Sequence, residues 1–118
     1  MNLISFKNNL YLASYGVSGE SGKLYKSTNG KDFKEISAIK EGVMSLVLYN
    51  DTLYVGTIGI KNKVTVGNLY QSTDGDTFNM IRKTEGGIHA LTTFKNNLYV
   101  GSWETTGSNN TGKLYKIY

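Results

Sequence analysis

The chain has 118 residues, a formal net charge of +4, fourteen glycines and neither proline nor cysteine. This length suits one domain, the absence of cysteine excludes disulfides and thiolate metal sites, and no apolar run is long enough to span a bilayer. The thirteen Lys and Arg residues are spread along the chain and form no basic stripe, so we expect neither a nucleic acid nor a membrane as a partner.

Two short patterns recur along the chain in a fixed order. The first occupies residues 6–14, 49–57 and 94–102, where it reads FKNNLYLAS, YNDTLYVGT and FKNNLYVGS. The second is Gly-x-Leu-Tyr, and it begins at Gly22, Gly67 and Gly112. Copies of the second pattern are 45 residues apart, whereas the first two copies of the first pattern are only 43 residues apart. The difference indicates an insertion between the two patterns, as expected for a loop.

Each repeat is expected to form four β-strands. In the second repeat, β-branched and aromatic runs predict strands at residues 43–49, 52–58, 67–73 and 77–82. Asn50-Asp51 is the predicted turn after the first strand, a loop at 57–66 follows the second, and Asp74-Gly75, a strong hairpin signal, follows the third. Since short turns join antiparallel neighbours, the unit is a four-stranded antiparallel meander. Such a unit, repeated at this length, is typical of a β-propeller blade.

We therefore predict an all-β chain of about two and a half to three propeller blades. The boundaries fall at about residues 1–41 and 42–86 for two complete blades and at about 87–118 for a truncated third blade, with eleven strands in total. Alternation along the second strand puts Leu53 and Val55 on one sheet face and Tyr54 on the other. The aligned small residues are expected where neighbouring blades approach closely. They are Ala13, Gly56 and Gly101.

Three blades are too few to close a ring, because propellers have about four to eight. Two copies related by a two-fold axis would complete six blades, so we expect a homodimer that closes a six-bladed ring. The alternative is that the chain is a natural or engineered fragment of a larger propeller, with no independent activity.

Residues 27–33 and 72–78 share a short motif on the predicted hairpin between the third and fourth strands. Its members are Ser27, Asn29, Gly30 and Phe33 in the first repeat and Ser72, Asp74, Gly75 and Phe78 in the second. The motif resembles a shortened form of the Asp-box of sialidase-like propellers, and this resemblance implies a structural turn away from any catalytic centre. Sialidases resemble one another in binding the substrate carboxylate through three arginines, whereas this chain has only Arg82. We therefore expect no sialidase activity.

The loops between the second and third strands differ most among the repeats, which makes them candidate recognition surfaces. Tyr15 and Trp103 begin two of these loops, where an exposed ring would stack on a sugar and Glu104 would bond its hydroxyls. Alternatively, the two rings cover blade edges. His89, the one histidine, begins a first strand beside the predicted channel, and this position offers too few ligands for a metal, so ordinary packing is expected there. These four residues are the candidate ligand-binding residues.

The sequence shows no nucleophile paired with a base, no phosphate-binding glycine loop and no series of metal ligands. We therefore expect a non-enzymatic binding or scaffold module that assembles by blade-to-blade packing, without a cofactor, and with a protein or a glycan as a further partner. A carbohydrate-binding propeller lectin is the alternative, and a hydrolase or lyase with carboxylates lining the channel is a third. The N-terminus shows no charged leader before an apolar stretch, so no retained signal peptide is expected, and the compartment stays open.

Overall fold

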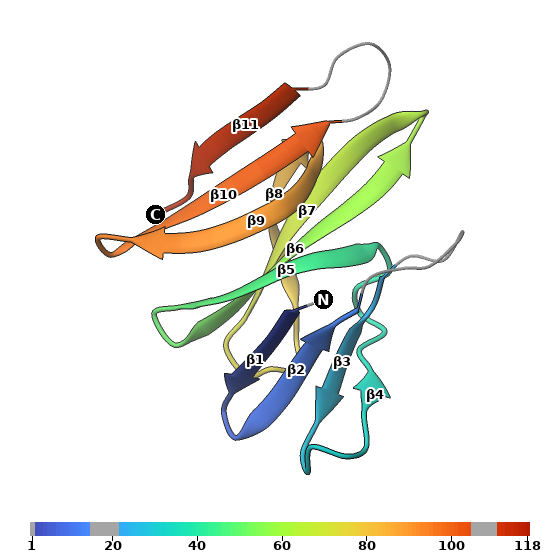
Figure 1. Cartoon of the computed structure of the whole chain (residues 1–118), viewed down its shortest axis with the longest axis vertical. Coiled ribbons are helices and arrows are strands. Elements are labelled where there is room, and N and C mark those ends of the chain that lie inside the picture. The colour runs from blue at the N-terminus through green and yellow to red at the C-terminus, as the bar shows by residue number, and fades with distance from the viewer. Residues whose placement is uncertain (1, 15–21, 105–110) are drawn as a thin grey trace.

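The computed structural model describes residues 2–14, 22–104 and 111–118, and all regular structure in these residues is β-strand (Figure 1). The first sheet consists of β1 (Asn2–Phe6), β2 (Asn9–Ala13), β3 (Leu24–Ser27) and β4 (Lys34–Glu35). The second consists of β5 (Gly42–Tyr49), β6 (Thr52–Lys61), β7 (Val64–Ser72) and β8 (Asn79–Glu85). The third consists of β9 (Gly87–Phe94), β10 (Asn97–Glu104) and β11 (Thr111–Lys116). Within each sheet, consecutive strands pair antiparallel, so the all-β class and the four-stranded antiparallel meander are confirmed.

Two-residue turns join the first and second strands of every sheet. Both residues of each turn have positive φ, between 48° and 63°. The turns are Lys7-Asn8, Asn50-Asp51 and Lys95-Asn96. Positive φ at both positions is the conformation of a type I′ turn, whose twist matches that of paired strands, and Asn and Asp adopt it more readily than most residues. The predicted turn at Asn50-Asp51 is therefore confirmed.

The connection between β6 and β7 corrects a prediction from the sequence. The loop expected at 57–66 is wrong, because β6 continues to Lys61 and β7 begins at Val64. Asn62 and Lys63, with φ of 52° and 65°, form a tight turn between them. The β-branched residues on both sides of this turn favour paired strands, and this preference outweighs the low strand propensity of Gly59. The fourth strand was also predicted too early, since β8 begins at Asn79 after a turn longer than two residues.

The three sheets are stacked in chain order, with the second sheet between the first and the third (Figure 1). One core joins the first sheet to the second, and its buried residues are Phe6, Tyr11, Ala13, Leu24, Ile39, Val43, Leu46, Leu53 and Val55. The other core joins the second sheet to the third, and its buried residues are Tyr54, Leu69, Ile88, Leu98 and Val100. Leu53 and Val55 thus belong to one core and Tyr54 to the other, as the alternation predicted.

Gly56 lies in the contact between the second and third sheets. A Cβ atom at this position would lie 2.4 Å from Cγ2 of Ile88 in the third sheet and 2.4 Å from the Ser45 hydroxyl oxygen, so no larger side chain fits. At Gly101, the equivalent position of the third sheet, the nearest atom is the Cβ of Ala90 at 3.4 Å, within the same sheet. The expected close approach is therefore confirmed at Gly56, and Gly101 faces no following sheet.

Candidate functional site

Residues 27–33 and 72–78, here called the first turn and the second turn, join β3 to β4 and β7 to β8. The same hydrogen bonds shape both turns. A serine hydroxyl accepts a bond from the N–H of the glycine, and the Asn or Asp side chain accepts bonds from the N–H groups of the two residues after that glycine, all at 2.8 Å. The glycines have similar positive φ, 78° at Gly30 and 84° at Gly75. In the second turn, the bonds from the N–H groups of Thr77 and Asp76 hold the pKa of Asp74 at about 2. The two turns therefore have one conformation.

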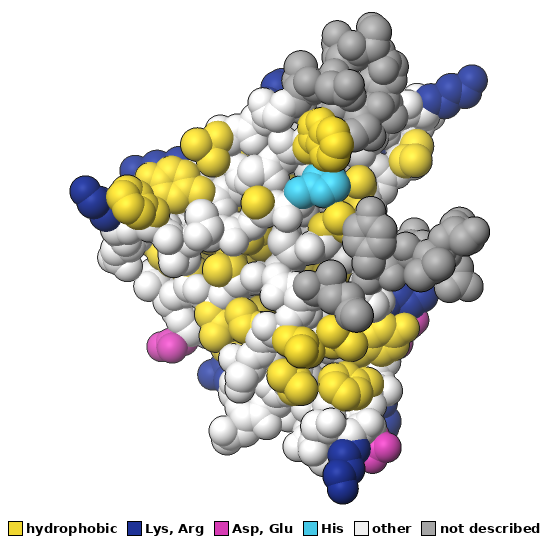
Figure 2. Space-filling model, in the orientation of Figure 1, with side chains coloured by type: hydrophobic (Ala, Val, Ile, Leu, Met, Phe, Trp, Pro, Cys, Tyr) yellow, Lys and Arg dark blue, Asp and Glu magenta, His cyan; other side chains and the backbone are white. Residues whose placement is uncertain are grey.

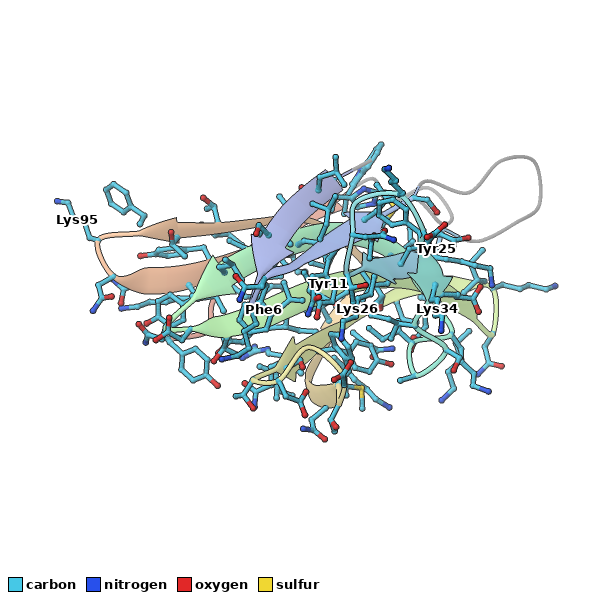
Figure 3. All side chains as sticks on the ribbon, turned by 90° about the horizontal axis from the view of Figure 1, so that it is seen from below. Phe6, Tyr11, Tyr25, Lys26, Lys34 and Lys95 are labelled. Carbon is cyan, nitrogen blue, oxygen red and sulfur yellow. The ribbon has the colours of Figure 1, made fainter. Side chains whose placement is uncertain are left out.

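The second turn receives a side chain from the first sheet. Tyr11 is fully buried, and its hydroxyl donates to the Gly75 carbonyl at 3.1 Å. A Cβ at Gly75 would lie only 2.0 Å from that hydroxyl oxygen, so the contact requires glycine. Beside it, the Lys26 ammonium group lies 2.6 Å from the Asp76 carboxylate, and Figure 3 shows Tyr11 and Lys26 together with Phe6. The second turn thus fastens the second sheet to the first.

The first turn has no such occupant. A Cβ at Gly30 would meet no atom within 4 Å in the described part of the chain. Phe33 is 37% exposed, whereas its counterpart Phe78 is half-buried and packs against the core between the first and second sheets. The first turn therefore presents the same geometry as the second, and no described side chain occupies the position at Gly30 that Tyr11 occupies at Gly75.

The third sheet exposes side chains whose counterparts are buried. Residues 6–11 and 94–99 have the same sequence, FKNNLY, yet Phe6 is 6% exposed and Phe94 is 59% exposed. Leu114 is 75% exposed, while the leucines at the equivalent positions of β3 and β7 are fully buried. We call this surface the third-sheet outer face, defined by Phe94, Tyr99, Trp103 and Leu114. No other sheet of the described residues packs against this face.

The first sheet is uncovered on its opposite side. A cross-strand row of Leu, then Leu or Val, then Tyr occupies the same place in every sheet. The rows are Leu3–Leu12–Tyr25, Leu46–Val55–Tyr70 and Leu91–Val100–Tyr115. The second and third rows pack into the cores, but the first row points away from the second sheet, and Leu3 is 58% exposed where Leu46 is 5% exposed. With Leu10, the first row forms the first-sheet outer face. Figure 2 shows hydrophobic side chains exposed over both outer sheets.

The structure brings together two of the candidate ligand-binding residues. The rings of His89 and Trp103 meet edge to face, with centroids 5.6 Å apart. Trp103 is 47% exposed, and Nε2 of His89 is buried without a hydrogen-bond partner in the described residues. The equivalent of Trp103 in the second sheet is Ile58, which packs over Gly87 of the third sheet. Trp103 therefore extends the third-sheet outer face. Tyr15 and the side chain of Glu104 lie outside the described residues.

Glu41, in the connection from the first sheet to the second, forms a polar contact that the sequence did not indicate. Its Oε1 accepts hydrogen bonds from the Asn68 amide at 2.6 Å and from the Tyr70 hydroxyl at 2.7 Å, while Oε2 is buried without a partner in the described residues. Burial raises the pKa of Glu41, but the bonds from Tyr70, from the backbone and from Asn68 outweigh it and hold this pKa below its usual value. Glu41 thereby ties the connection to β7.

Comparison of the chain with protein-family models, with curated proteins and with solved structures finds no match. In the part of the chain that the structure describes, no three metal-ligating side chains gather into a group, and no helix is long and apolar enough to cross a membrane. Function must therefore be inferred from the surfaces described above.

Proposed function

We propose that the chain is a non-enzymatic assembly module made of β-propeller blades, which binds a second copy of itself through the two outer faces. One observation carries the proposal: the phenylalanine that begins the hexapeptide FKNNLY is 6% exposed in the first sheet, where another sheet follows, and 59% exposed in the third sheet, where none does. Identical side chains in the same strand and turn favour the same covering surface.

The two outer faces match the two sides of the internal contacts. Within the chain, the face that carries Tyr11 or Tyr54 always meets the Leu–Val–Tyr row of the following sheet. The third-sheet outer face carries Tyr99 and has no row to meet, and the first-sheet outer face carries a row and has no preceding sheet. Packing one onto the other repeats the internal contact between two copies.

A contact of this kind joins different surfaces of the two partners, so it forms a ring only if the rotation closes. Two copies with three sheets each give six blades, within the range of about four to eight in which propellers close. Three copies would give nine. We therefore propose a two-fold symmetric homodimer in which each copy contributes both faces.

Light scattering after size-exclusion chromatography tests the proposal on the 118-residue chain. The expected mass is twice that of the 13.0 kDa monomer. Leu114→Ser is expected to weaken the dimer, since burial of its exposed surface contributes about 1–2 kcal/mol per contact, or thirtyfold to thousandfold in dissociation constant for two contacts. Ile60→Ser is the matched control, because Ile60 is 76% exposed and lies on neither outer face. A monomeric wild-type chain, or equal effects of the two substitutions, would contradict the proposal.

Carbohydrate binding is the second candidate function, and the exposed ring of Trp103 beside His89 favours it. An aromatic ring in this setting stacks on the apolar face of a sugar. A glycan array is the test, with Trp103→Ala as the variant that should lose any signal. A wild-type chain that binds no glycan would remove this candidate.

A further inference from the structure

The tyrosines of the three sheets differ in what they contact. Tyr11 donates its hydroxyl to the Gly75 carbonyl of the second turn. Tyr54 packs against Tyr118, with ring centroids 6.3 Å apart, and burial together with Tyr118 raises the pKa of Tyr54 to about 12. The hydroxyl of Tyr99 makes no hydrogen bond within the described residues, and Gly30 of the first turn has no neighbour in the place where Gly75 meets Tyr11. Among these three aligned tyrosines, Tyr99 is therefore the one whose hydroxyl and ring make no such contact within the described residues, and the first turn is the one of the two turns that no described tyrosine meets.

We propose that Tyr99 of one copy donates its hydroxyl to the Gly30 carbonyl of a second copy, as Tyr11 donates to Gly75 within one chain. The proposal rests on the proposed function, since the third-sheet outer face must meet the first-sheet outer face. To the proposed dimer it adds the hydrogen-bond acceptor of Tyr99, which is the Gly30 carbonyl, and with it the alignment of the two outer faces. Tyr99 lies in the same hexapeptide as Tyr11, and the first turn has the bonds and the φ angle of the second.

The same alignment places like charges opposite each other. Within the chain, Lys26 pairs with Asp76 at 2.6 Å. The residues at these two positions of the contact between copies are Lys116 and Lys31. Two ammonium groups repel one another, and salt screens this repulsion. Association of the wild-type chain should therefore tighten as salt is added, and Lys31→Asp should tighten it at low salt by supplying the missing carboxylate.

Sedimentation equilibrium on the full chain gives the dimer dissociation constant for the wild type and for three variants. Tyr99→Phe is expected to raise it about tenfold to hundredfold, because a closed dimer loses two buried hydrogen bonds. Gly30→Asn is expected to abolish the dimer at concentrations where the wild type is dimeric, since Asn tolerates positive φ but adds a Cβ where the hydroxyl would lie. Lys31→Asp is expected to lower the constant about tenfold at low salt.

Two controls separate the contact from folding. Tyr99→Phe and Gly30→Asn should leave the melting temperature measured at monomeric concentration nearly unchanged. The internal counterpart Gly75→Asn should lower it, because its Cβ would lie 2.0 Å from the Tyr11 hydroxyl oxygen.

The outcomes distinguish the two proposals. A wild-type dimer whose dissociation constant is unchanged in both Tyr99→Phe and Gly30→Asn would overturn the tyrosine contact and leave the assembly proposal standing. A weaker dimer in Lys31→Asp would overturn the alignment that places Lys31 of one copy opposite Lys116 of the other. A wild-type chain that stays monomeric at every concentration would overturn both proposals.

Discussion

Phe6 and Phe94 begin the same hexapeptide, and replacing each by alanine is expected to change a different property of the chain. Phe6 is 6% exposed and belongs to the core between the first and second sheets. Removing a buried phenylalanine ring costs about 3–5 kcal/mol in free energy of unfolding, a large share of the 5–15 kcal/mol that stabilises an ordinary domain. Phe94 is 59% exposed, so Phe94→Ala should cost about 1 kcal/mol or less in a single chain. It should instead weaken association.

Urea denaturation at concentrations where the chain is monomeric measures the first property, and sedimentation measures the second. The free energy of unfolding is obtained by linear extrapolation, with the denaturant slope compared between variants to check that the unfolding transition is the same. Phe6→Leu, with an expected cost of about 1 kcal/mol, replaces Phe6→Ala if the latter does not fold. If Phe94→Ala costs as much as Phe6→Ala at monomeric concentration, then Phe94 is covered within one chain and the reasoning about the outer faces fails.

Three further predictions follow from the close contacts, the second turn and the paired outer faces. Gly56→Ala should destabilise the chain by about 1–3 kcal/mol because its Cβ has no room, whereas Gly101→Ala should be tolerated; equal melting temperatures for the two variants would contradict this. The pKa of Asp74 is about 2 in the folded chain against 3.8 ordinarily, so its contribution to stability is complete above about pH 4 and is lost as the pH falls toward 2. Asp74→Asn, which keeps the acceptor oxygen, should flatten this part of the melting-temperature profile between pH 5 and pH 2, and parallel profiles would count against it. Finally, in a mixture of Lys31→Cys and Lys116→Cys chains, a short bismaleimide should join one variant to the other, since the chain has no native cysteine; joining of each variant to itself would indicate a different arrangement.

Much of the fold could be predicted from the sequence because the repeat fixes local features. The strand faces follow from alternation, which is why Leu53 and Tyr54 were assigned to opposite sides correctly. The turn at Asn50-Asp51 follows from residues that accept positive φ. The hairpin at Asn62-Lys63 was missed because the other repeats have no equivalent pattern there and Gly59 interrupts the β-branched run. Its signal was the pair of β-branched runs on either side of the asparagine.

Apart from the close approach at Gly56, the specific contacts between sheets could not be predicted from the sequence, since they depend on how the sheets stack. The motif at 72–78 predicted a turn, but nothing in it indicated that Tyr11 would bond Gly75 across 64 residues. Glu41 was passed over for a similar reason: it lies in a connection whose partners, Asn68 and Tyr70, come from a later strand. His89 and Trp103 were each proposed as candidates, but their contact depends on the register between β9 and β10.

Each sheet is built from consecutive strands of the chain, and this has a consequence for how the chain opens. Each sheet can lose its own hydrogen bonds without unthreading another, so opening should proceed sheet by sheet from the ends. The second sheet, covered on both sides, should keep its amide protons longest, and β4, with two residues, should exchange among the first. Association of two copies would cover the outer sheets as the outer sheets already cover the second sheet. The range of amide-proton exchange rates along the chain should therefore become narrower as the protein concentration rises.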